Sequence, residues 1–485
     1  MRCAPLTLAL ILLTGAQAAS LPKRVKRVLD ETPAARSAFW GIQVVDLRNG
    51  RTLYALNQDK FFVPASNTKL FTTALALTRL GPRFTFETRI MAPAAPDAAG
   101  SLKGPLRLIG GGDPNLSGRA IPYRPGSPAG NPLAIVEDLA NQVASKGVKR
   151  IEGDIVGDDT VYVWQPYPDG WGIEDPVYEY GAAVSALTLN DGALTVRIAP
   201  GGREGDPAAI AVNPPVEYYA IDNRIRTVAA GGAPEIHLSR APGGFELDLW
   251  GTIPVGGPGQ DFALGIDDPA QYAAQALRQA LENRGIAITG NAAAAHRYPE
   301  DAEPPPVSGV TLAEHTSAPL IEDLAITDKV SQNLHAELAL HAVGRAKRNA
   351  GSLAAGLEEL KAFLAEAEIE ETGYSIHDGS GLSRLNLVTP ATVVKLLRYM
   401  YAGPLRESWI SLLPVGGQDG TLTGRQLSQR IHAKTGSLAH VHALSGYAER
   451  RNGSWVAFSI LVNNADRPAS EVRGIMDRIC TLLLD

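Results

Sequence analysis

Three short motifs hold the residues of this sequence that could do covalent chemistry on a substrate. The first contains Ser66 and, three positions later, Lys69. Residues three apart share one face of a helix, so the Lys69 amine can approach the Ser66 hydroxyl. An enclosed amine with a lowered pKa can act as a base and turn that hydroxyl into a nucleophile. Taken alone the pair decides little, because this spacing also arises by chance on an exposed helix face.

The second motif is Ser331-Gln332-Asn333, which lies just before a helix predicted to begin at Leu334. A Ser at a helix start is more commonly a plain cap. The motif therefore gains weight only in combination with the others.

The third motif is Lys434-Thr435-Gly436-Ser437, at the opening of a predicted hairpin. It places a cation beside two hydroxyls, a set that suits the carboxylate of a substrate. Gly436 lets the backbone come close to a partner. A surface turn would explain the same residues without a function, although this motif is the rarest of the three.

Hairpins and helices that could position these motifs are predicted near both ends of the chain. Strand-like runs at 40–47 and 52–56 flank an Asn-Gly turn, and a helix should follow from Ser66 to about Gly81-Pro82. A second hairpin is predicted at 443–449 and 455–462, with a last helix at 472–484. We expect the two hairpins to share one antiparallel sheet. Further helices are predicted at 334–343, 356–367 and 391–401.

The middle of the chain has a different sequence pattern, in which short strand-like runs are separated by Gly and Pro. Strands are predicted at 106–109, 151–156, 194–198 and 245–250, and helices at 132–145 and 269–283. A Pro-rich stretch at 299–306 looks like a linker. We therefore divide the mature chain into a split domain, residues 19–87 and 300–485, and a β-rich insertion, residues 88–299. None of the three motifs lies in the insertion, so we expect it to be accessory to the chemistry.

Composition and the N-terminus restrict the class of protein. The chain has 485 residues, 45% hydrophobic and 20% charged, with a net charge of −6 and no dense basic run, which argues against a nucleic-acid binder. Residues 1–18 have a basic start, an apolar run and Ala16-Gln17-Ala18, which predicts a signal peptide cleaved after Ala18. The apolar run is too short to span a membrane, so we expect an exported protein of the periplasm or cell envelope, without a transmembrane anchor after cleavage. Cleavage leaves Cys480 as an unpaired thiol, expected to be buried.

In this order and context, the motifs resemble the S-x-x-K, S-x-N and K-T-G elements of penicillin-binding proteins and serine β-lactamases. Other stretches narrow the resemblance to the class C low-molecular-mass penicillin-binding proteins, the S13 D-alanyl-D-alanine carboxypeptidase/endopeptidase group. They are Gly-Gly-Gly-Asp-Pro at 110–114, Tyr-Gly-Ala-Ala-Val-Ser-Ala-Leu at 180–187, Asp-Gly-Ser-Gly-Leu-Ser-Arg at 378–384 and Asp-Gly-Thr-Leu at 419–422. Gln332 stands where many relatives have Asp. Ser437 replaces Thr and keeps the hydroxyl.

The resemblance implies an α+β fold: a β-lactamase/transpeptidase-like domain, with an antiparallel sheet and helices on both sides, split by an insertion of two smaller β-rich domains. It also implies serine acyl transfer on peptides ending in D-alanyl-D-alanine, without a cofactor or a metal. Substrates would be the stem peptides and cross-links of peptidoglycan, and β-lactam antibiotics would acylate and inhibit the enzyme.

By the same resemblance each motif residue has a role. Ser66 attacks the penultimate D-Ala carbonyl, Lys69 takes its proton, and Ser331 relays a proton to the departing amine. Asn333 holds the substrate amide, the backbone N–H groups of Ser66 and Ser437 form the oxyanion hole, and Lys434 with Thr435 and Ser437 binds the terminal carboxylate. The loop 378–381 shapes the cleft. The alternatives are a β-lactamase or esterase on the same scaffold, or a non-catalytic peptidoglycan-binding protein.

Overall fold

The computed structural model describes residues 20–485, and a five-stranded antiparallel sheet joins the two ends of this chain. The signal peptide predicted at 1–18 lies outside the described residues. The strand order is β19 (Ile431–Leu438), β20 (Val441–Glu449), β21 (Trp455–Asn463), β1 (Phe39–Asp46) and β2 (Thr52–Leu56). β1 pairs with β21 over its whole length. The prediction that the two hairpins share one sheet is therefore confirmed.

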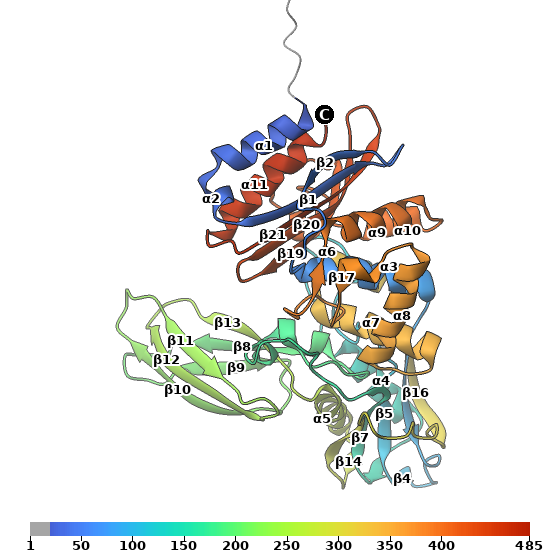
Figure 1. Cartoon of the computed structure of the whole chain (residues 1–485). Coiled ribbons are helices and arrows are strands. Elements are labelled where there is room, and N and C mark those ends of the chain that lie inside the picture. Colours follow the sequence, from blue (N-terminus) through green and yellow to red (C-terminus); the bar gives the residue numbers. More distant parts are fainter. Residues whose placement is uncertain (1–19) are drawn as a thin grey trace, which may run out of the picture.

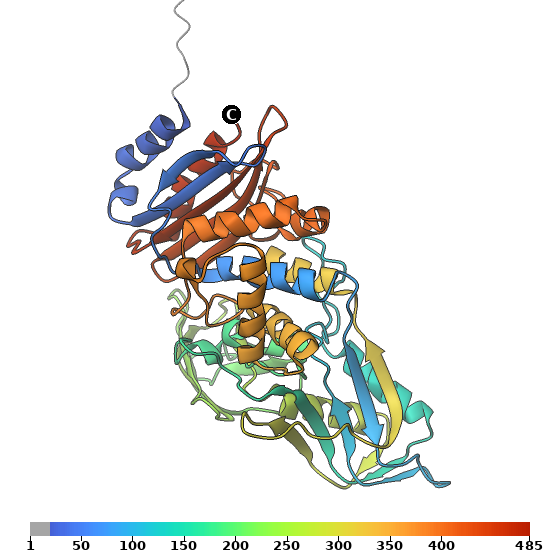
Figure 2. The same ribbon diagram turned by 45° about the vertical axis from the view of Figure 1, so that its right-hand side comes forward.

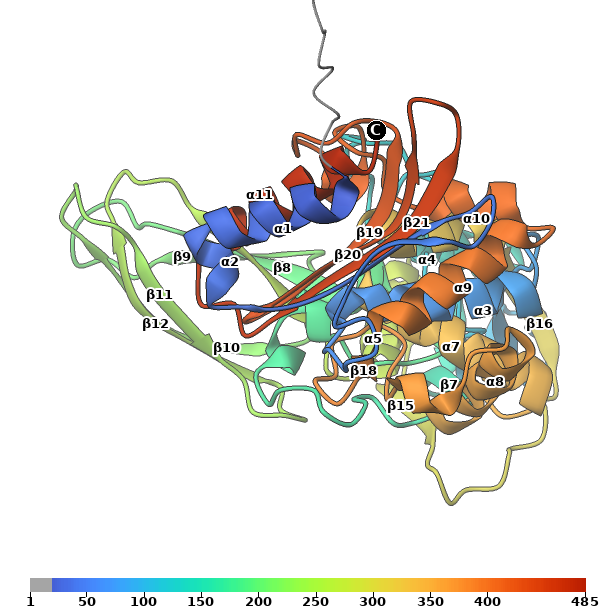
Figure 3. The ribbon, with the colours of Figure 1, turned by 45° about the horizontal axis from the view of Figure 1, so that its top comes forward.

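Helices cover both faces of this sheet (Figure 3). One face packs against α1 (Leu21–Glu31), α2 (Pro33–Arg36) and α11 (Ala469–Leu482), and the buried Ile42 and Val44 of β1 point into this layer. Val45, the next residue along, points to the opposite face, as the twofold alternation of a strand requires. Cys480 is buried between the sheet and the end helices, as expected.

The opposite face packs against a helical layer in the middle of the molecule (Figure 1). Its members are α3 (Lys69–Arg79), α6 (Leu320–Lys329), α7 (Asn333–Arg348), α8 (Leu353–Glu366), α9 (Pro390–Ala402) and α10 (Arg406–Leu412). Caps explain several of their starts, because Ser352 and Thr389 accept backbone N–H groups of α8 and α9. The antiparallel sheet between two helical layers confirms the predicted α+β class.

The insertion begins with a mixed five-stranded sheet in the order β15-β7-β5-β3-β16. Its strands are β15 (Ala292–Arg297), β7 (Ile155–Val163), β5 (Leu106–Ile109), β3 (Glu87–Ala92) and β16 (Val310–Thr316), accompanied by α4 (Ala134–Ser145) and α5 (Pro269–Glu282). β16 pairs antiparallel with β3, and the two lie side by side in Figure 2. By strand pairing, residues 310–316 thus belong with the insertion, although the sequence prediction assigned them to the split domain.

A small three-stranded sheet, β14-β6-β4, extends this part with β14 (Ala287–Ile288), β6 (Arg150–Glu152) and β4 (Ser101–Lys103). The single strand predicted at 151–156 is wrong, because the chain turns at Gly153-Asp154 and divides the segment between β6 and β7. Gly153 lies against the backbone of Gly104, too close for a side chain.

Two more three-stranded sheets form an outer lobe (Figure 1). One has the order β13-β8-β9, with β13 (Gln260–Gly265), β8 (Ala193–Ala199) and β9 (Ala209–Asn213). The other, which we call the outer sheet, has the order β10-β12-β11, with β10 (Ala220–Val228), β12 (Glu246–Pro254) and β11 (Glu235–Ser239). None of the helices in residues 20–485 is both long and apolar enough to cross a membrane.

Candidate active site

Ser66 lies in a short 3₁₀ turn, η1 (Ala65–Thr68), that leads directly into α3. Ala65 just before it has a left-handed backbone, with φ of 48°, a conformation that costs a non-glycine residue about 1–3 kcal/mol and recurs at functional sites. The turn is held by Gly381, itself at φ of 86°, where an added Cβ would lie 2.0 Å from Ala65 O. Only glycine fits at this contact.

Lys69 opens α3 and points at the nucleophile candidate. Its Nζ lies 3.1 Å from Ser66 Oγ and donates to Asn333 Oδ1 at 2.6 Å and to the backbone oxygen of Ser380 at 2.7 Å. The side chain is completely buried. This burial, and then the nearby positive charge of Lys434, lower the pKa of Lys69 well below its usual value.

Ser331 faces the other lysine of the motifs. Lys434 Nζ donates to Ser331 Oγ at 2.8 Å and to Thr435 O at 3.0 Å. Burial lowers the pKa of Lys434 to about 8, and the carboxylate of Asp328 partly opposes this shift. Ser331 has φ of 67°, a second left-handed residue beside the site. It is not the cap of α7, because Gln332 accepts the N–H of Leu334 instead.

Asn333 is the first residue of α7, one position earlier than the predicted helix start. Its Oδ1 accepts from Lys69, and its Nδ2 donates to the backbone oxygen of Tyr180 at 2.8 Å. Tyr180 belongs to the insertion. The side chain that orients the Lys69 amine is therefore itself oriented by the insertion, a contact that was not predicted from the sequence.

Strand β19 brings the third motif alongside Ser66. An added Cβ on Gly436 would lie 2.8 Å from Pro64 O and 3.1 Å from Ser66 N, so glycine allows this close approach. Asn67 Nδ2 fixes the approach by donating to Lys434 O at 3.0 Å. Thr435 Oγ1 donates to Thr421 Oγ1 at 2.8 Å. The backbone of the strand thus lies next to the amide of the candidate nucleophile.

The loop 378–381 forms the third wall around Lys69. Its Ser380 carbonyl accepts from the Lys69 amine. Glu337, buried on α7, accepts the N–H groups of Gly379 and Ser380 at 2.8–3.0 Å.

The same loop also contacts the insertion through Asp378. This buried carboxylate accepts from Gly381 N at 2.8 Å and from Trp171 Nε1, in the insertion, at 3.0 Å. The sequence marked this loop as shaping the cleft but gave no sign of its contact with Lys69.

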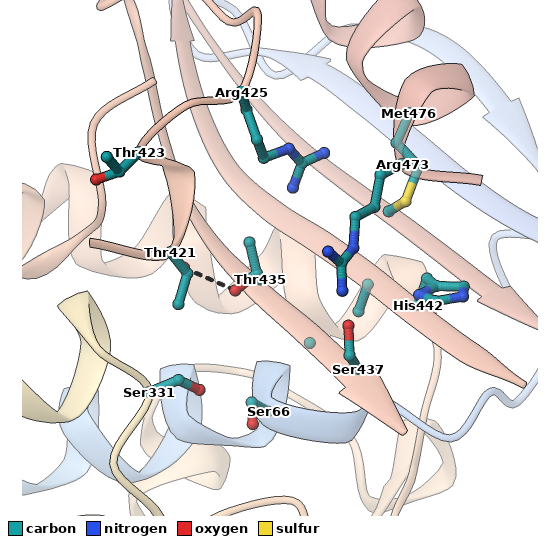
Figure 4. Close-up of a pocket in the computed structure, with 12 residues that line it drawn as sticks. Ser66, Ser331, Thr421, Thr423, Arg425, Thr435, Ser437, His442, Arg473 and Met476 are labelled. Carbon is teal, nitrogen blue, oxygen red and sulfur yellow. Dashed lines mark hydrogen bonds between the residues drawn. The ribbon is translucent and has the colours of Figure 1, made fainter. Parts of the chain in front are cut away.

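A cleft of about 410 Å³ opens over these groups (Figure 4). Of the predicted site residues, Ser66, Ser331, Thr435, Gly436 and Ser437 line it. Lys69, Asn333 and Lys434 reach the same centre by their hydrogen bonds to these residues or to one another. The remaining lining residues were not predicted, and they are Thr421, Thr423, Arg425, His442, Ala443, Arg473 and Met476. In the described part of the chain, no group of three or more His, Cys, Asp or Glu could hold a metal ion.

Comparison with known proteins places this geometry in a family. The model of the D-Ala-D-Ala carboxypeptidase 3 (S13) family matches residues 21–483. A D-alanyl-D-alanine carboxypeptidase from Actinomadura sp. (strain R39) is 34% identical over 471 residues, covering 94% of this chain and 83% of that protein. The penicillin-sensitive carboxypeptidase A of Dictyostelium discoideum is 28% identical, covering 93% and 88%. The fold matches penicillin-binding protein 4 of Haemophilus influenzae with a TM-score of 0.80 at 23% identity, covering 95% of this chain and 98% of that one.

Proposed function

The chain belongs to the D-Ala-D-Ala carboxypeptidase 3 (S13) family, and we propose that Ser66 is the nucleophile with which it cleaves peptides ending in D-alanyl-D-alanine. Ser66 attacks the carbonyl of the penultimate D-Ala and forms an acyl-enzyme, the terminal D-Ala leaves, and water then hydrolyses the ester. The same attack on a β-lactam ring gives a penicilloyl-enzyme. The name of the Dictyostelium relative, a penicillin-sensitive enzyme, supports this second reaction.

The observation that carries the proposal is the set of three partners around the Lys69 amine. A neutral amine has two hydrogens to donate and one lone pair with which to accept. Asn333 Oδ1 and Ser380 O take the two hydrogens, and the third direction points at Ser66 Oγ, 3.1 Å away. The lowered pKa of Lys69 favours the neutral form. Lys69 is thus arranged to accept the Ser66 proton, a step that contributes about 10²–10⁴-fold to rates.

Ser331 carries the proton to the leaving amine. Because Lys434 Nζ donates to Ser331 Oγ, the hydrogen of the Ser331 hydroxyl is directed away from Lys434 and towards the cleft. Lys434 thereby supports the relay and contributes a positive charge to the floor of the site. The lowered pKa values of Lys69 and Lys434 allow protons to pass between these groups near neutral pH.

The substrate binds along β19. The backbone N–H groups of Ser66 and Ser437 bind the developing oxyanion, and Asn333 contributes its remaining amide hydrogen to the substrate amide. The hydroxyls of Thr435 and Ser437 face the carboxylate of the leaving residue. The same cleft accepts peptidoglycan stem peptides and their cross-links, because a cross-link also presents a carboxylate beside the scissile bond. The predicted signal peptide directs export of the enzyme to the periplasm or cell envelope, where these substrates lie, and is then cleaved off.

Labelled penicillin and a synthetic D-Ala-D-Ala peptide test the proposal together. We expect release of D-Ala from the peptide and a penicillin adduct that mass spectrometry maps to Ser66. An adduct on another serine would refute the assignment of the nucleophile. Rapid penicillin hydrolysis without D-Ala release would indicate a β-lactamase, and peptidoglycan binding without any adduct would indicate a non-catalytic binder.

A further inference from the structure

The cleft does not end at the third motif but continues across β19 towards α11. Beyond Ser437 it is lined by Arg425, His442, Arg473 and Met476 (Figure 4). His442 is the cross-strand partner of Ser437, so their side chains share one face of the sheet. This stretch of the cleft carries two guanidinium groups, and no acidic residue lines it.

Lys434 is poorly placed to bind a carboxylate directly. Its side chain is fully buried, its Nζ is engaged by Ser331 Oγ and Thr435 O, and it does not line the cleft. The hydroxyls of Thr435 and Ser437 do line it. A carboxylate held by these hydroxyls therefore needs its positive partner from another element.

Arg473 meets that need. It lies on the first turns of α11 and is exposed, and within residues 20–485 it has neither an ion-pair partner nor a hydrogen bond from its side chain. Figure 4 shows its guanidinium extending from α11 towards Ser437. Its neighbour Arg425 is different, because Asp477 of α11 accepts from both Nε and Nη2 of its guanidinium and so balances its charge. Arg473 is thus the guanidinium that a ligand in this cleft can engage.

We propose that Arg473 is the residue that recognises the carboxylate of the leaving amino acid, acting together with the hydroxyls of Thr435 and Ser437. The proposal rests on the function proposed above. It covers a terminal D-Ala carboxylate and the equivalent carboxylate on the D-centre of a cross-link. A planar guanidinium binds a carboxylate through two parallel N–H donors, a geometry that an ammonium group does not offer.

His442 supports the same conclusion. Burial and then the positive charges of Arg473 and Arg425 lower its pKa, so the imidazole is neutral in the empty cleft. Its Nδ1 is buried and finds no hydrogen-bond partner among residues 20–485. A bound carboxylate would offset the charge of Arg473, whose guanidinium has no ion-pair partner within residues 20–485.

A pair of substrates tests the role of Arg473 in the full-length mature enzyme. One peptide ends in D-Ala-D-Ala with a free carboxylate, and the other is its C-terminal amide. A hydrogen bond to a charged group contributes about 1.5–3 kcal/mol to binding, which corresponds to roughly ten- to 150-fold. We therefore expect wild-type kcat/KM to favour the acid over the amide by this factor. Arg473→Gln should reduce this preference to within about threefold, and Arg473→Lys should retain an intermediate preference.

Arg478→Gln is the matched control, because Arg478 lies on the same helix, is exposed and does not line the cleft. It should keep the wild-type preference. If Arg473→Gln keeps the full wild-type preference, the assignment is wrong and direct binding by Lys434 regains support. If the wild type does not prefer the acid, carboxylate recognition in this cleft is refuted. If the wild type cleaves neither peptide and forms no adduct at Ser66, the proposed function itself fails.

Discussion

A buried arginine of the insertion and the two buried lysines of the motifs in the split domain differ in their partners. In the insertion a buried guanidinium meets a buried carboxylate, as in the pair of Arg240 with Asp267 at 2.6 Å. In the split domain Lys69 and Lys434 are equally buried, yet neither has an ion-pair partner within residues 20–485. A buried cation with an ion-pair partner keeps its proton, whereas burial without a partner lowers the pKa of an amine, so that it gives up its proton more readily. The difference agrees with the proposal that protons move at Lys69 and Lys434.

The insertion is itself divided. Within residues 20–485, no hydrogen bond of the strand pairing in its outer sheet involves a motif residue. The segment 164–191, by contrast, contacts Asn333 and two residues that support the site. Trp171 donates to Asp378, Tyr180 O accepts from Asn333, and Asp191 pairs with His335, two residues beyond Asn333. We therefore keep the expectation of an accessory role for only part of the insertion. The segment 164–191 orients the site, and the outer sheet remains the candidate accessory surface.

The largest expected effect should follow from removing the hydroxyl of Ser66, the proposed nucleophile. Ser66→Ala should abolish penicillin acylation and D-Ala release, because within residues 20–485 Ser66 provides the one hydroxyl that lies within hydrogen-bond distance of the Lys69 amine. The melting temperature should stay close to that of the wild type, since only one hydroxyl is lost. Ser239→Ala, on exposed β11 of the outer sheet, should change neither. Acylation that survives in Ser66→Ala would remove the chemical contrast between the two regions.

The sequence was sufficient to predict the residues of the candidate site, but not the residues that surround and orient them. All eight motif residues meet at one centre, because fixed spacing on α3 and β19 makes local geometry predictable. The contacts of Ser380 and Tyr180, and the place of Arg473 in the cleft, were not predictable. Each of these residues lies far along the chain from the group it approaches. Every residue type has a backbone carbonyl, so the sequence cannot indicate which carbonyl will accept a hydrogen bond.

The fold shows the same limit. The turns at Asn-Gly and the Pro starts of helices mark local boundaries, and the hairpins were correct. β16 was missed because its segment follows a linker and its pairing partner, β3, lies more than 200 residues earlier. The division between β6 and β7 depends on the close approach of Gly153 to Gly104, a tertiary contact that overrides the local strand pattern.

The second prediction concerns pH and the junction between the two regions. His335 is fully buried between Asp323 at 2.6 Å and Asp191 at 3.1 Å. Although burial opposes it, the two carboxylates raise the pKa of His335 to about 9. A raised pKa stabilises the fold fully below the unfolded value of about 6.5, and this contribution is lost as pH rises through about 9. The size of this term is at most about 3 kcal/mol.

Urea unfolding between pH 6 and pH 10 measures this term. His335→Gln should cost most stability near pH 6, and its difference from the wild type should shrink towards pH 10. His237→Gln, on exposed β11 of the outer sheet, should follow the wild-type profile at every pH. A constant difference between His335→Gln and the wild type across this range would mean that the junction does not depend on the charge of His335.

A smaller effect should follow from the Trp171 contact with the loop 378–381. Trp171→Phe removes one hydrogen bond to the buried Asp378 carboxylate, which should cost about 2 kcal/mol of unfolding free energy. Penicillin acylation should slow several-fold, because the same loop holds the Ser380 carbonyl against Lys69. Trp250→Phe, on β12 of the outer sheet, should change neither quantity. Equal effects from the two tryptophans would abolish the proposed division within the insertion.

The smallest expected effect tests whether every contact between the insertion and the site matters. Tyr123 reaches from the insertion to accept the N–H of Gly420 at 3.2 Å, and the next residue, Thr421, accepts from Thr435. The Tyr123 bond is neutral, long and only partly buried, so Tyr123→Phe should cost about 1 kcal/mol or less. Acylation should change less than threefold, because Thr435 stays fixed in β19 by its own strand pairing. A rate loss greater than that of Trp171→Phe would show that the insertion controls the site through β19 rather than through the loop 378–381.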